Sequence, residues 1–420
     1  MYIRKLTVFI SILMAGFNGC KTTPEAPAKQ SQGEMALSSI LPKGILPGAK
    51  PKVPAGRSQG ETVLEFDSYL TLPKEILQGS NYQIAEHVQV EEYQYVFTIK
   101  SDFGEITAKG RHMLDLRLRE LKSIEAAQKL SKDPHFVNGI LSPMKDTEKG
   151  LELIVNEPFE SLERAPKGFN LMANQYIDPA DRRAGSPDRR KIAAALDCDP
   201  ETTNPVLKKL LDQMTFEMFT GSLITQAAMS YIPGLSVPAT TTKMKELIVN
   251  NPPSVINKQI DRELEVAGVE ESIRSRFRYS TAFTTVQRLQ LMEQFRALRG
   301  VQNRGVLIEI AAKAHTEAEA LSAIYKGKML ADIQERHRIW LLKFAELFPL
   351  VVLGNGTHVL VSPYDYLTST RELEKYVDTY RVSNPNVTTV LIIAGRVSTA
   401  ARKKIESASI RIVEEGTPDL

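Results

Sequence analysis

The sequence has very little cysteine. Its 420 residues include only two, Cys20 and Cys198, so the chain can form at most one internal disulfide. Proteins too small to build a core depend on several disulfides, whereas a chain of this length can bury a sizeable core without them. The sequence therefore predicts a protein that is held together by packing and not by cross-links.

The sequence also lacks a strong excess of charge of either sign. It has 53 Lys and Arg residues against 50 Asp and Glu residues, a formal net charge of +3. Nucleic-acid-binding proteins usually show a marked basic excess, so we expect no nucleic-acid partner. Apolar residues at 42% and charged residues at 25% are typical of an ordinary globular protein, and the length favours two or three domains.

Common catalytic and metal-binding motifs are missing. The sequence contains no G-x-S-x-G, no P-loop and no G-x-G-x-x-G, which argues against familiar serine-hydrolase and nucleotide sites. No two of its histidines are two, three or four residues apart, as metal ligands on one element would be. The histidines are His87, His112, His135, His315, His337 and His358. We therefore expect no metal, no cofactor and no catalytic residue.

One short segment matches a catalytic pattern in part. Ser142 and Lys145 have the S-x-x-K spacing of the serine–lysine pair in penicillin-binding proteins. The companion K-T-G is absent, and Pro143 disfavours the helix that would bring the two side chains together. We interpret the match as coincidence.

A second segment matches a calcium-binding loop in part. Asp197, Asp199 and Glu201 occupy positions 1, 3 and 5 of that pattern. Position 6 is Thr202 where the loop requires glycine, and position 12 is Lys208 where it requires glutamate. These acids are better interpreted as turn and helix-capping residues.

Cys198 lies between two aspartates in that segment. Their negative charge disfavours the thiolate and raises the pKa of the thiol. We expect an inert structural cysteine, with a nucleophilic or redox thiol as the alternative.

The N-terminus has the order of a bacterial secretion signal. Arg4 and Lys5 give a positive start, and residues 6–17 form an apolar run of twelve. This run is too short for a stable membrane-spanning helix, and it ends at Gly19-Cys20, so residues 1–19 fit a cleaved signal peptide. The alternative is an ordinary secretion signal with a coincidental cysteine.

The Gly19-Cys20 end resembles the lipobox of bacterial lipoproteins. The resemblance implies that Cys20 is diacylated, as with palmitate, and becomes the mature N-terminus. Two or three acyl chains hold a protein on a membrane, whereas one gives only marginal binding. Lys21, where some lipoproteins have aspartate, implies the outer membrane with the protein facing the periplasm, if the host is Gram-negative.

Residues 20–60 lack apolar periodicity and contain six prolines. The composition predicts a disordered tether that follows the lipidated cysteine. Its lysines serve solubility in one interpretation. In the other they contact anionic head groups or wall polymer.

Residues 61–150 have the pattern of an α+β domain. Polar and apolar residues alternate over 82–90, 93–100 and 105–109, which predicts an antiparallel meander. Residues 113–130 follow the helical period and can cover one face of that sheet.

Residues 151–348 are predicted to be mostly helical. Asn204 and Pro205 have the residue types of a helix start. The apolar stretch 215–238 indicates a buried helix, with an interfacial membrane contact as the alternative. Residues 270–299 predict one long amphipathic helix, and 309–348 a further helix that breaks near Gly327.

Residues 349–420 are predicted to form a small α/β unit. Asn355-Gly356 between two apolar runs is a strong hairpin signal, and residues 370–380 have helical character. Strand 389–393, a helix to Ser407 and strand 410–413 imply a parallel right-handed crossover. The predicted fold class is thus α+β and multi-domain, with a meander, a helical middle and this unit.

The turn before that last helix is a candidate anion site, formed by Gly395, Arg396, Ser398 and Thr399. The free N–H groups at a helix start can hold a phosphate or carboxylate, and an arginine lies beside them. The glycines that let a nucleotide approach closely are missing, and a serine is also an ordinary helix cap. A purely structural turn is therefore the alternative.

The runs from Gly185 to Leu196 and from Asn204 to Leu207 are similar to segments of uncharacterised bacterial envelope proteins, a likeness that implies no activity. We expect a membrane-anchored envelope lipoprotein that binds or scaffolds an unknown ligand. Its partners would be the membrane, through the lipid, and an envelope protein or polymer. The alternative is an envelope hydrolase with a site assembled from separate segments, which a pocket joining a base to a nucleophile would favour.

Overall fold

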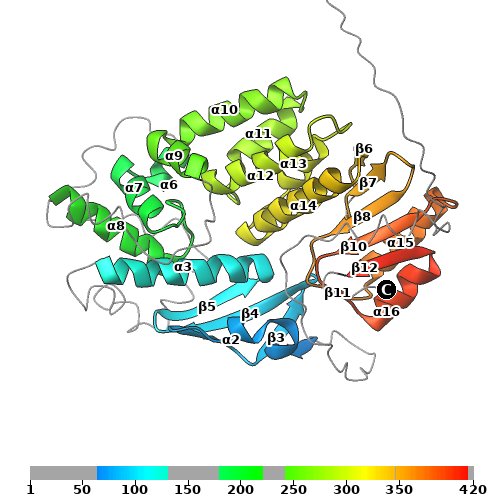
Figure 1. The fold of residues 1–420 in the computed structure, drawn as a ribbon, viewed down its shortest axis with the longest axis horizontal. Coiled ribbons are helices and arrows are strands. Elements are labelled where there is room, and N and C mark those ends of the chain that lie inside the picture. Colours follow the sequence, from blue (N-terminus) through cyan, green and yellow to red (C-terminus); the bar gives the residue numbers. More distant parts are fainter. Residues whose placement is uncertain (1–63, 131–178, 221–241, 346, 415–420) are drawn as a thin grey trace, which may run out of the picture. The chain divides into compact units, whose positions relative to one another are not determined.

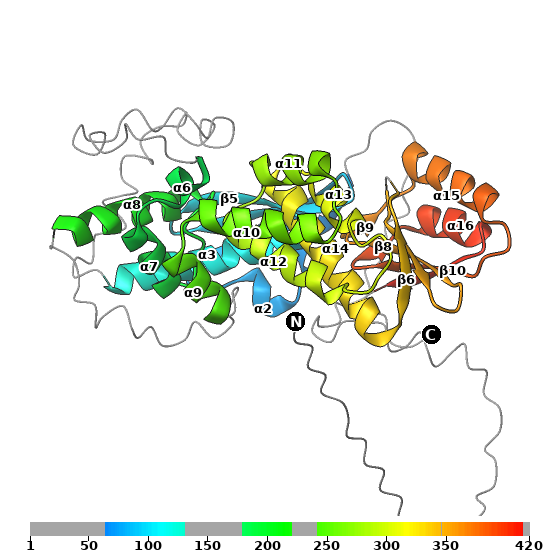
Figure 2. The same ribbon diagram turned by 90° about the horizontal axis from the view of Figure 1, so that it is seen from above.

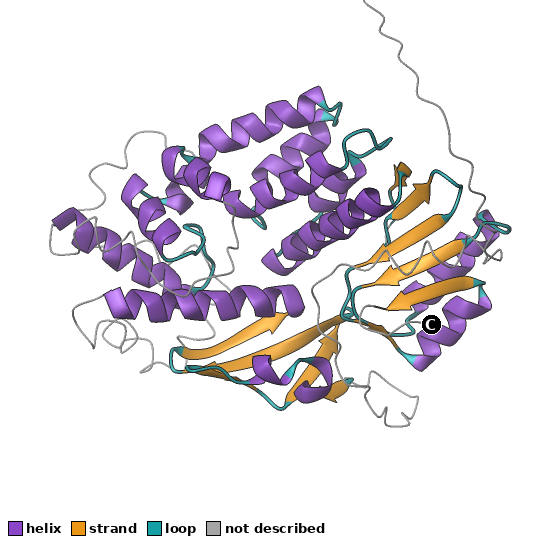
Figure 3. Cartoon of the chain, in the orientation of Figure 1, coloured by secondary structure: helices purple, strands orange, loops and turns teal. Residues whose placement is uncertain are grey.

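The computed structural model describes residues 64–130, 179–220, 242–345 and 347–414 (Figure 1). These residues belong to one compact unit within Ile40–Leu420. They combine helices with two five-stranded sheets and one two-stranded sheet (Figure 3). The predicted α+β fold class, with a meander, a helical middle and C-terminal strands, is confirmed.

Some of the predicted features lie outside the described residues. They are the secretion signal 1–19, the lipidated Cys20, the tether 20–60 and the pattern at Ser142 and Lys145. The apolar stretch 215–238 is described only as far as residue 220.

The N-terminal sheet is antiparallel throughout. Its strands are β1 (Glu65–Asp67), β2 (Tyr82–Ile84), β3 (His87–Glu91), β4 (Gln94–Ser101) and β5 (Gly104–Lys109), and two short helices, α1 (Ser68–Thr71) and α2 (Lys74–Leu77), follow β1. The order is β1-β3-β4-β2, and β5 also pairs with β4.

One predicted strand of the meander is wrong in its length. Residues 82–90 form two strands, because the chain leaves the regular ladder between β2 and β3. It advances six residues from Gln83 to Gln89, whereas the facing positions on β4 advance only four, from Lys100 to Val96. An irregularity of this kind bends a strand locally, and alternation in sequence does not reveal it.

Helix α3 (Arg111–Leu130) packs on β4 and β5. Its residues Leu114, Leu121 and Ile124 are buried, and they share one hydrophobic core with residues of the sheet and of α8 (Pro205–Thr220). This core therefore extends across the boundary predicted near residue 150.

The helical middle consists of short helices. They are α6 (Pro179–Ala184), α7 (Pro187–Ala195), α8, α9 (Thr242–Asn250), α10 (Pro253–Val266), α11 (Glu271–Tyr279), α12 (Thr285–Ala297), α13 (Val306–Ala311) and α14 (Glu317–Arg336). The single helix predicted over 270–299 is wrong, because α11 and α12 are separate. Thr284 accepts a hydrogen bond from the backbone of Gln287, whose side chain bonds back to Thr284, and such a capping box starts a new helix.

The prediction of a helix over 309–348 with a break near Gly327 is wrong in both its extent and the position of its break. The chain breaks before Thr316, which caps α14, and α14 continues through Gly327. A Cβ at Gly327 would lie 3.0 Å from the Cβ of Gln294 on α12. This glycine therefore allows two helices to approach closely and does not end a helix. After α14 the chain forms a strand, β6 (Ile339–Lys343).

The C-terminal sheet has the strand order β12-β10-β8-β7-β6. Its other strands are β7 (Leu350–Leu353), β8 (His358–Ser362), β10 (Thr389–Ile393) and β12 (Ile410–Glu414), and a small parallel pair joins β9 (Tyr366–Leu367) to β11 (Arg396–Val397). The hairpin of β7 and β8 and the parallel pairing of β10 with β12 are both as predicted.

Helices α15 (Arg371–Ser383) and α16 (Thr399–Ser407) lie beside each other on one face of this sheet (Figure 2). Their apolar residues form one core with β8, β10 and β12. All residues of β8 and β10 are buried, so the sheet is covered on both faces, as the near-continuous apolar runs of these parallel strands require.

Candidate functional site

A buried polar network occupies the place where α3, α12 and α14 meet the loop between α7 and α8. We call it the junction network. Its members are Arg117, Glu120, Asp199, Glu201, Thr202, Thr203, Asn204, Thr284, Gln287 and Glu317.

Arg117 lies at the centre of the junction network. Its Nη1 donates to Glu120 at 2.7 Å, and its Nη2 donates to Glu317 and to the hydroxyl of Thr203, both at 2.8 Å. The residue is only 9% exposed. A buried guanidinium is stable only when carboxylates and hydrogen-bond acceptors surround it, and two helices 200 residues apart in sequence supply them.

Glu120 ties the loop to α3. It accepts hydrogen bonds from the hydroxyl of Thr202 and from Nδ2 of Asn204, the latter at 3.2 Å. Oδ1 of Asn204 in turn accepts from the backbone N–H of Val206 and Leu207 at 3.0 and 3.2 Å. Asn204 is therefore the N-cap of α8, as its residue type predicts.

The two other acids of the loop face the start of α12. Asp199 accepts hydrogen bonds from the hydroxyl of Thr284 and from the backbone of Glu201, and Glu201 accepts from the backbone of Thr285 at 2.9 Å. Burial, reinforced by the charge of Glu201, raises the pKa of Asp199 to about 8. Asp199 therefore holds its proton to a higher pH than an exposed carboxyl group does.

This arrangement uses its carboxylates for internal bonds. Among the described residues, no group of three or more His, Cys, Asp and Glu side chains is placed to hold a metal ion. The acids of the calcium-like segment serve instead in turns and at helix starts. The junction network acts chemically as an interlock between helices.

The thiol of Cys198 lies beside the same network. Burial raises its pKa well above the ordinary value, and the nearby carboxylates of Glu120 and Asp199 add to the effect. The direction is the one predicted from the flanking aspartates, but burial is the larger cause. A thiol with a raised pKa is a poor nucleophile.

The residues predicted as an anion site lie in the short segment that runs from the end of β10 to the first residue of α16. Gly395 is in close contact with the backbone of Asp365, since a Cβ there would lie 1.9 Å from the Asp365 carbonyl oxygen. Arg396 pairs with Tyr366 in the small sheet. A glycine is therefore needed at position 395 because the backbone of Asp365 passes too close for a side chain.

The start of α16 already faces a carboxylate. Ser398 caps the helix by accepting from the backbone of Ala401 at 3.2 Å, and Thr399 is the first helical residue. The backbone N–H of Val397 donates to Glu414 at 2.6 Å. An external anion at this turn would compete with Glu414, and anion binding here stays a prediction.

Asp365 is a buried carboxylate that sequence patterns did not indicate. It accepts hydrogen bonds from the backbone N–H groups of Tyr95 and Arg111, each at 3.1 Å. Burial raises the pKa of Asp365 above its usual range. The residue joins the loop after β8 to β4 and to the start of α3, and no local motif in its segment signals that role.

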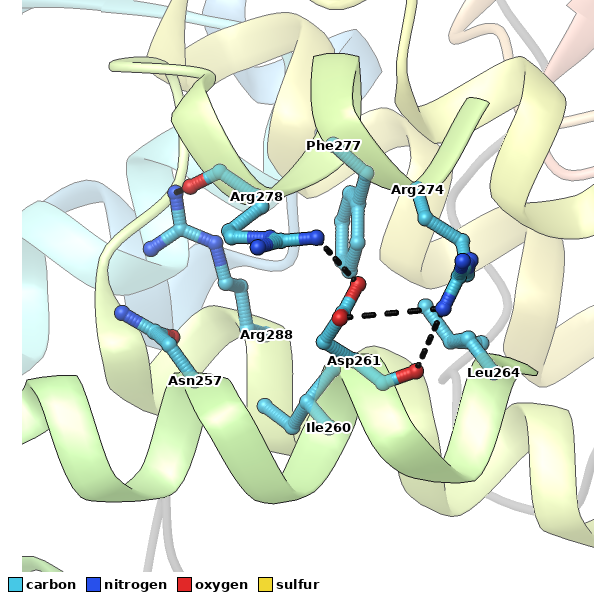
Figure 4. A pocket seen from close by; sticks show the side chains of 8 residues that line it. All are labelled: Asn257, Ile260, Asp261, Leu264, Arg274, Phe277, Arg278 and Arg288. Carbon is cyan, nitrogen blue, oxygen red and sulfur yellow. Dashed lines mark hydrogen bonds and ion pairs between the residues drawn. The ribbon is translucent and has the colours of Figure 1, made fainter. Parts of the chain in front are cut away.

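Three arginines surround a small cavity between α10, α11 and α12, which we call the arginine pocket (Figure 4). Its polar lining residues are Asn257, Asp261, Arg274, Arg278 and Arg288. Its apolar lining residues are Ile260, Leu264 and Phe277. The amphipathic pattern of residues 270–299 does not indicate that these arginines converge.

The chain matches no protein-family model, no curated protein and no solved structure. Within the described ranges, none of the helices combines the length and the apolar character that crossing a membrane requires. The fold class is α+β, and the comparisons assign no function.

Proposed function

We propose that the protein is a lipid-anchored lipoprotein of the bacterial cell envelope that binds or scaffolds another envelope component. The observation that carries the proposal is the order of the N-terminal sequence. A positive start, an apolar run over residues 6–17 and Gly19-Cys20 follow one another as in a lipoprotein signal. In a Gram-negative host the anchor would lie in the outer membrane with the body in the periplasm.

The proposed tether suits this arrangement. Forty residues of flexible chain have a root-mean-square reach of roughly 35 Å. The folded body would then stand clear of the lipid surface while remaining close to periplasmic partners or wall polymer.

The chemistry of the described residues supports binding over catalysis. Two buried basic side chains have strongly lowered pKa values, and each makes a structural contact. Burial lowers the pKa of His112 to about 4, and the centre of its ring lies 3.9 Å from that of the Tyr325 ring, at a tilt of 34°. Burial lowers the pKa of Lys326 to about 8, and its ammonium lies 5.8 Å from the centre of the Tyr364 ring.

Asp199 favours the alternative, an envelope hydrolase. A carboxyl group with a pKa of about 8 is suited to general acid–base chemistry near neutral pH. Its oxygens are, however, bonded to Thr284 and to the backbone of Glu201, and the neighbouring thiol of Cys198 has a raised pKa. Binding therefore remains the better-supported function.

One experiment distinguishes polymer binding from hydrolysis. The mature chain carrying Cys20→Ser is incubated with purified peptidoglycan, and both pelleted protein and soluble fragments are measured. Co-sedimentation without fragments supports polymer binding, and fragments that disappear in Asp199→Asn favour the hydrolase. If neither occurs, cross-linking of the anchored protein in cells should yield a defined envelope protein, and the absence of any cross-linked species would contradict the proposal.

A further inference from the structure

The edges of the two five-stranded sheets differ in how they are covered. Beside β6 the backbone N–H of Gln302 donates to Trp340 and its C=O accepts from Leu342, each at 3.0 Å. Strands β1 and β2 are only three residues long. Native proteins protect sheet edges in these ways, by covering them or by keeping them short. Strand β5 has six residues, and among the described residues it pairs with β4 alone, at the border of its sheet (Figure 1).

The hydrogen bonds to β4 determine which backbone groups of β5 point outwards. The backbone N–H of Gly110 donates to the carbonyl oxygen of Tyr95 at 2.7 Å, so every second residue of β5, counted back from Gly110, bonds to β4 in the observed register. Backbone groups alternate in direction along a strand. The N–H and C=O groups of Glu105, Thr107 and Lys109 therefore point away from β4, towards the open edge.

The side chains of the same three residues lie on the face of the sheet opposite the core. Ala108 is buried and faces Phe97 of β4, and both belong to the core that the sheet shares with α3. Successive side chains of a strand point to opposite faces. Glu105 and Thr107 are accordingly exposed, and the side chain of Lys109 is 33% exposed. A strand that paired with this edge would meet outward backbone groups and accessible side chains together.

This edge is complementary to a second copy of itself. When two β5 strands run antiparallel with Thr107 facing Thr107, Glu105 of each copy faces Lys109 of the other. The outward N–H and C=O groups of all three residues then have partners. Charged residues usually protect an edge from association, but here the two-fold axis places each carboxylate opposite an ammonium group, and such cross-strand pairs are favourable.

The charges that already surround β5 are compatible with this pairing. Within one copy, Lys109 contacts Glu91 and Glu92, and Glu105 faces Lys100 in the register of β4 and β5. The second copy would add a further opposite charge beside each of the two residues and no like charge directly across from them. In β-strand pairing the backbone hydrogen bonds provide affinity and the side chains provide specificity, so these charges serve mainly to fix the register.

The outer strand of the C-terminal sheet, β12, lacks this complementarity. An antiparallel pairing of two copies about Ile412 would place Arg411 against Val413 and Glu414 against Ile410. None of the charged residues of β12 would then face an opposite charge. The described edges therefore favour β5 as the strand for self-association.

We propose that the protein forms a two-fold symmetric dimer in which β5 pairs antiparallel with β5 of a second copy. The contact is isologous, since the same strand serves both copies, and it joins two N-terminal sheets into one. Ile106, partly buried at the margin of the core, would face Ala108 of the second copy, so the pairing also removes apolar surface from water. The dimer does not depend on lipid attachment.

Sedimentation equilibrium of the mature chain carrying Cys20→Ser tests the proposal. We expect a monomer–dimer equilibrium. Glu105→Lys and Lys109→Glu each place like charges face to face across the axis and should raise the dimer Kd at least tenfold. The double variant should recover most of the affinity. Within one copy that double change places like charges together, so the recovery can arise only between copies. Glu75→Lys, the same change at an exposed position of α2, should leave Kd unchanged.

Cross-linking locates the contact without relying on the charge variants. Thr107→Cys in the same chain should bring two thiols within reach of a short bis-maleimide, because facing residues of a hydrogen-bonded strand pair have Cα atoms about 5.5 Å apart. Gln89→Cys, an exposed position on β3, is the control, and the parent reports any background from Cys198. Cross-linked dimer from Thr107→Cys alone is the expected result. A monomer up to millimolar concentration, a dimer whose Kd ignores both charge reversals, or equal cross-linking of the two cysteine variants would overturn the proposal.

Discussion

The C-terminal sheet and the junction network hold the chain together by different physical means. Strands β8 and β10 are buried along their whole length, and burial of apolar surface stabilises them without directional bonds. The junction network instead joins helices through a buried guanidinium and carboxylates. Such bonds depend on every partner being present, so the network specifies how the helices meet and tolerates change poorly.

The two regions should therefore respond differently to single substitutions. Apolar cores accept changes that preserve volume, usually for less than about 1.5 kcal/mol. Removing one member of a buried charge cluster leaves the others uncompensated. Four experiments probe this contrast, and each has a reference variant in the same chain.

Arg117→Leu should have the largest effect. It removes the shared partner of Glu120 and Glu317 and leaves both carboxylates buried, which we expect to lower the free energy of unfolding by about 3–5 kcal/mol. Urea unfolding followed by circular dichroism measures it. The reference is Arg119→Leu on the same helix, whose side chain is 30% exposed and pairs with Asp115, with an expected loss of under about 1 kcal/mol. Equal losses in the two variants would contradict an interlock at this junction.

Gly395→Ala should follow, with a loss of about 3 kcal/mol from overpacking. The new Cβ would lie 1.9 Å from the carbonyl oxygen of Asp365, so the backbone must move. Gly354→Ala is the control, because its Cβ would meet nothing nearer than 3.7 Å. Thermal unfolding of both variants checks the difference, and a Gly395→Ala protein as stable as the control would show that this contact is not tight.

The pH dependence of stability comes third. The pKa of Asp199 is raised to about 8 by burial, so the folded state holds a proton that the unfolded state releases near pH 4. The contribution of protonated Asp199 to the free energy of unfolding is complete below the unfolded pKa and is lost as the pH rises through 8. We therefore expect unfolding to become steadily easier as the pH rises from 5 to 8.

Asp199→Asn isolates this effect, because the amide resembles the neutral carboxyl and does not titrate. His112, whose pKa burial lowers to about 4, acts in the opposite direction, since its stabilisation is lost as pH falls below 6.5. Urea unfolding from pH 5 to pH 8.5 should give a steeper decline with rising pH in the parent than in Asp199→Asn. Parallel curves would mean that Asp199 is ionised in the folded protein.

The smallest expected effects concern two helix caps. Ser398→Ala removes only the cap of α16, which typically costs about 1 kcal/mol. Thr284→Ala removes the cap of α12 and also the hydrogen bond to Asp199, and should cost about 2 kcal/mol. Chemical denaturation resolves this difference. A larger loss for Ser398→Ala would reverse the comparison between the two regions.

The same contrast explains what could be predicted from the sequence. Asn204, Asn355-Gly356 and Ser398 act locally, through a cap, a turn and a cap, and the structure has all three. The capping box from Thr284 to Gln287 is also local and could have been found from its T-x-x-Q spacing. Gly327 was misread because its role depends on Gln294 in another helix.

The candidate sites were harder to predict for the same reason. The bond between Arg117 and Glu317 joins residues 200 positions apart, and nothing near either residue indicates it. Asp365 and the arginine pocket likewise depend on tertiary packing. The predicted anion residues do lie together at the start of α16, but the sequence does not indicate that Glu414 accepts a hydrogen bond from this segment.

Lipid attachment is the central claim about function, and metabolic labelling tests it most directly. Cells producing the full chain are fed a palmitate analogue, and the labelled protein is quantified for the parent, Cys20→Ser and Cys198→Ser. The second variant is the matched control, because the chain has only these two cysteines. We expect equal labelling of the parent and Cys198→Ser and no labelling of Cys20→Ser. Labelling of Cys20→Ser at the level of the parent, or no labelling of any form despite export, would contradict the account.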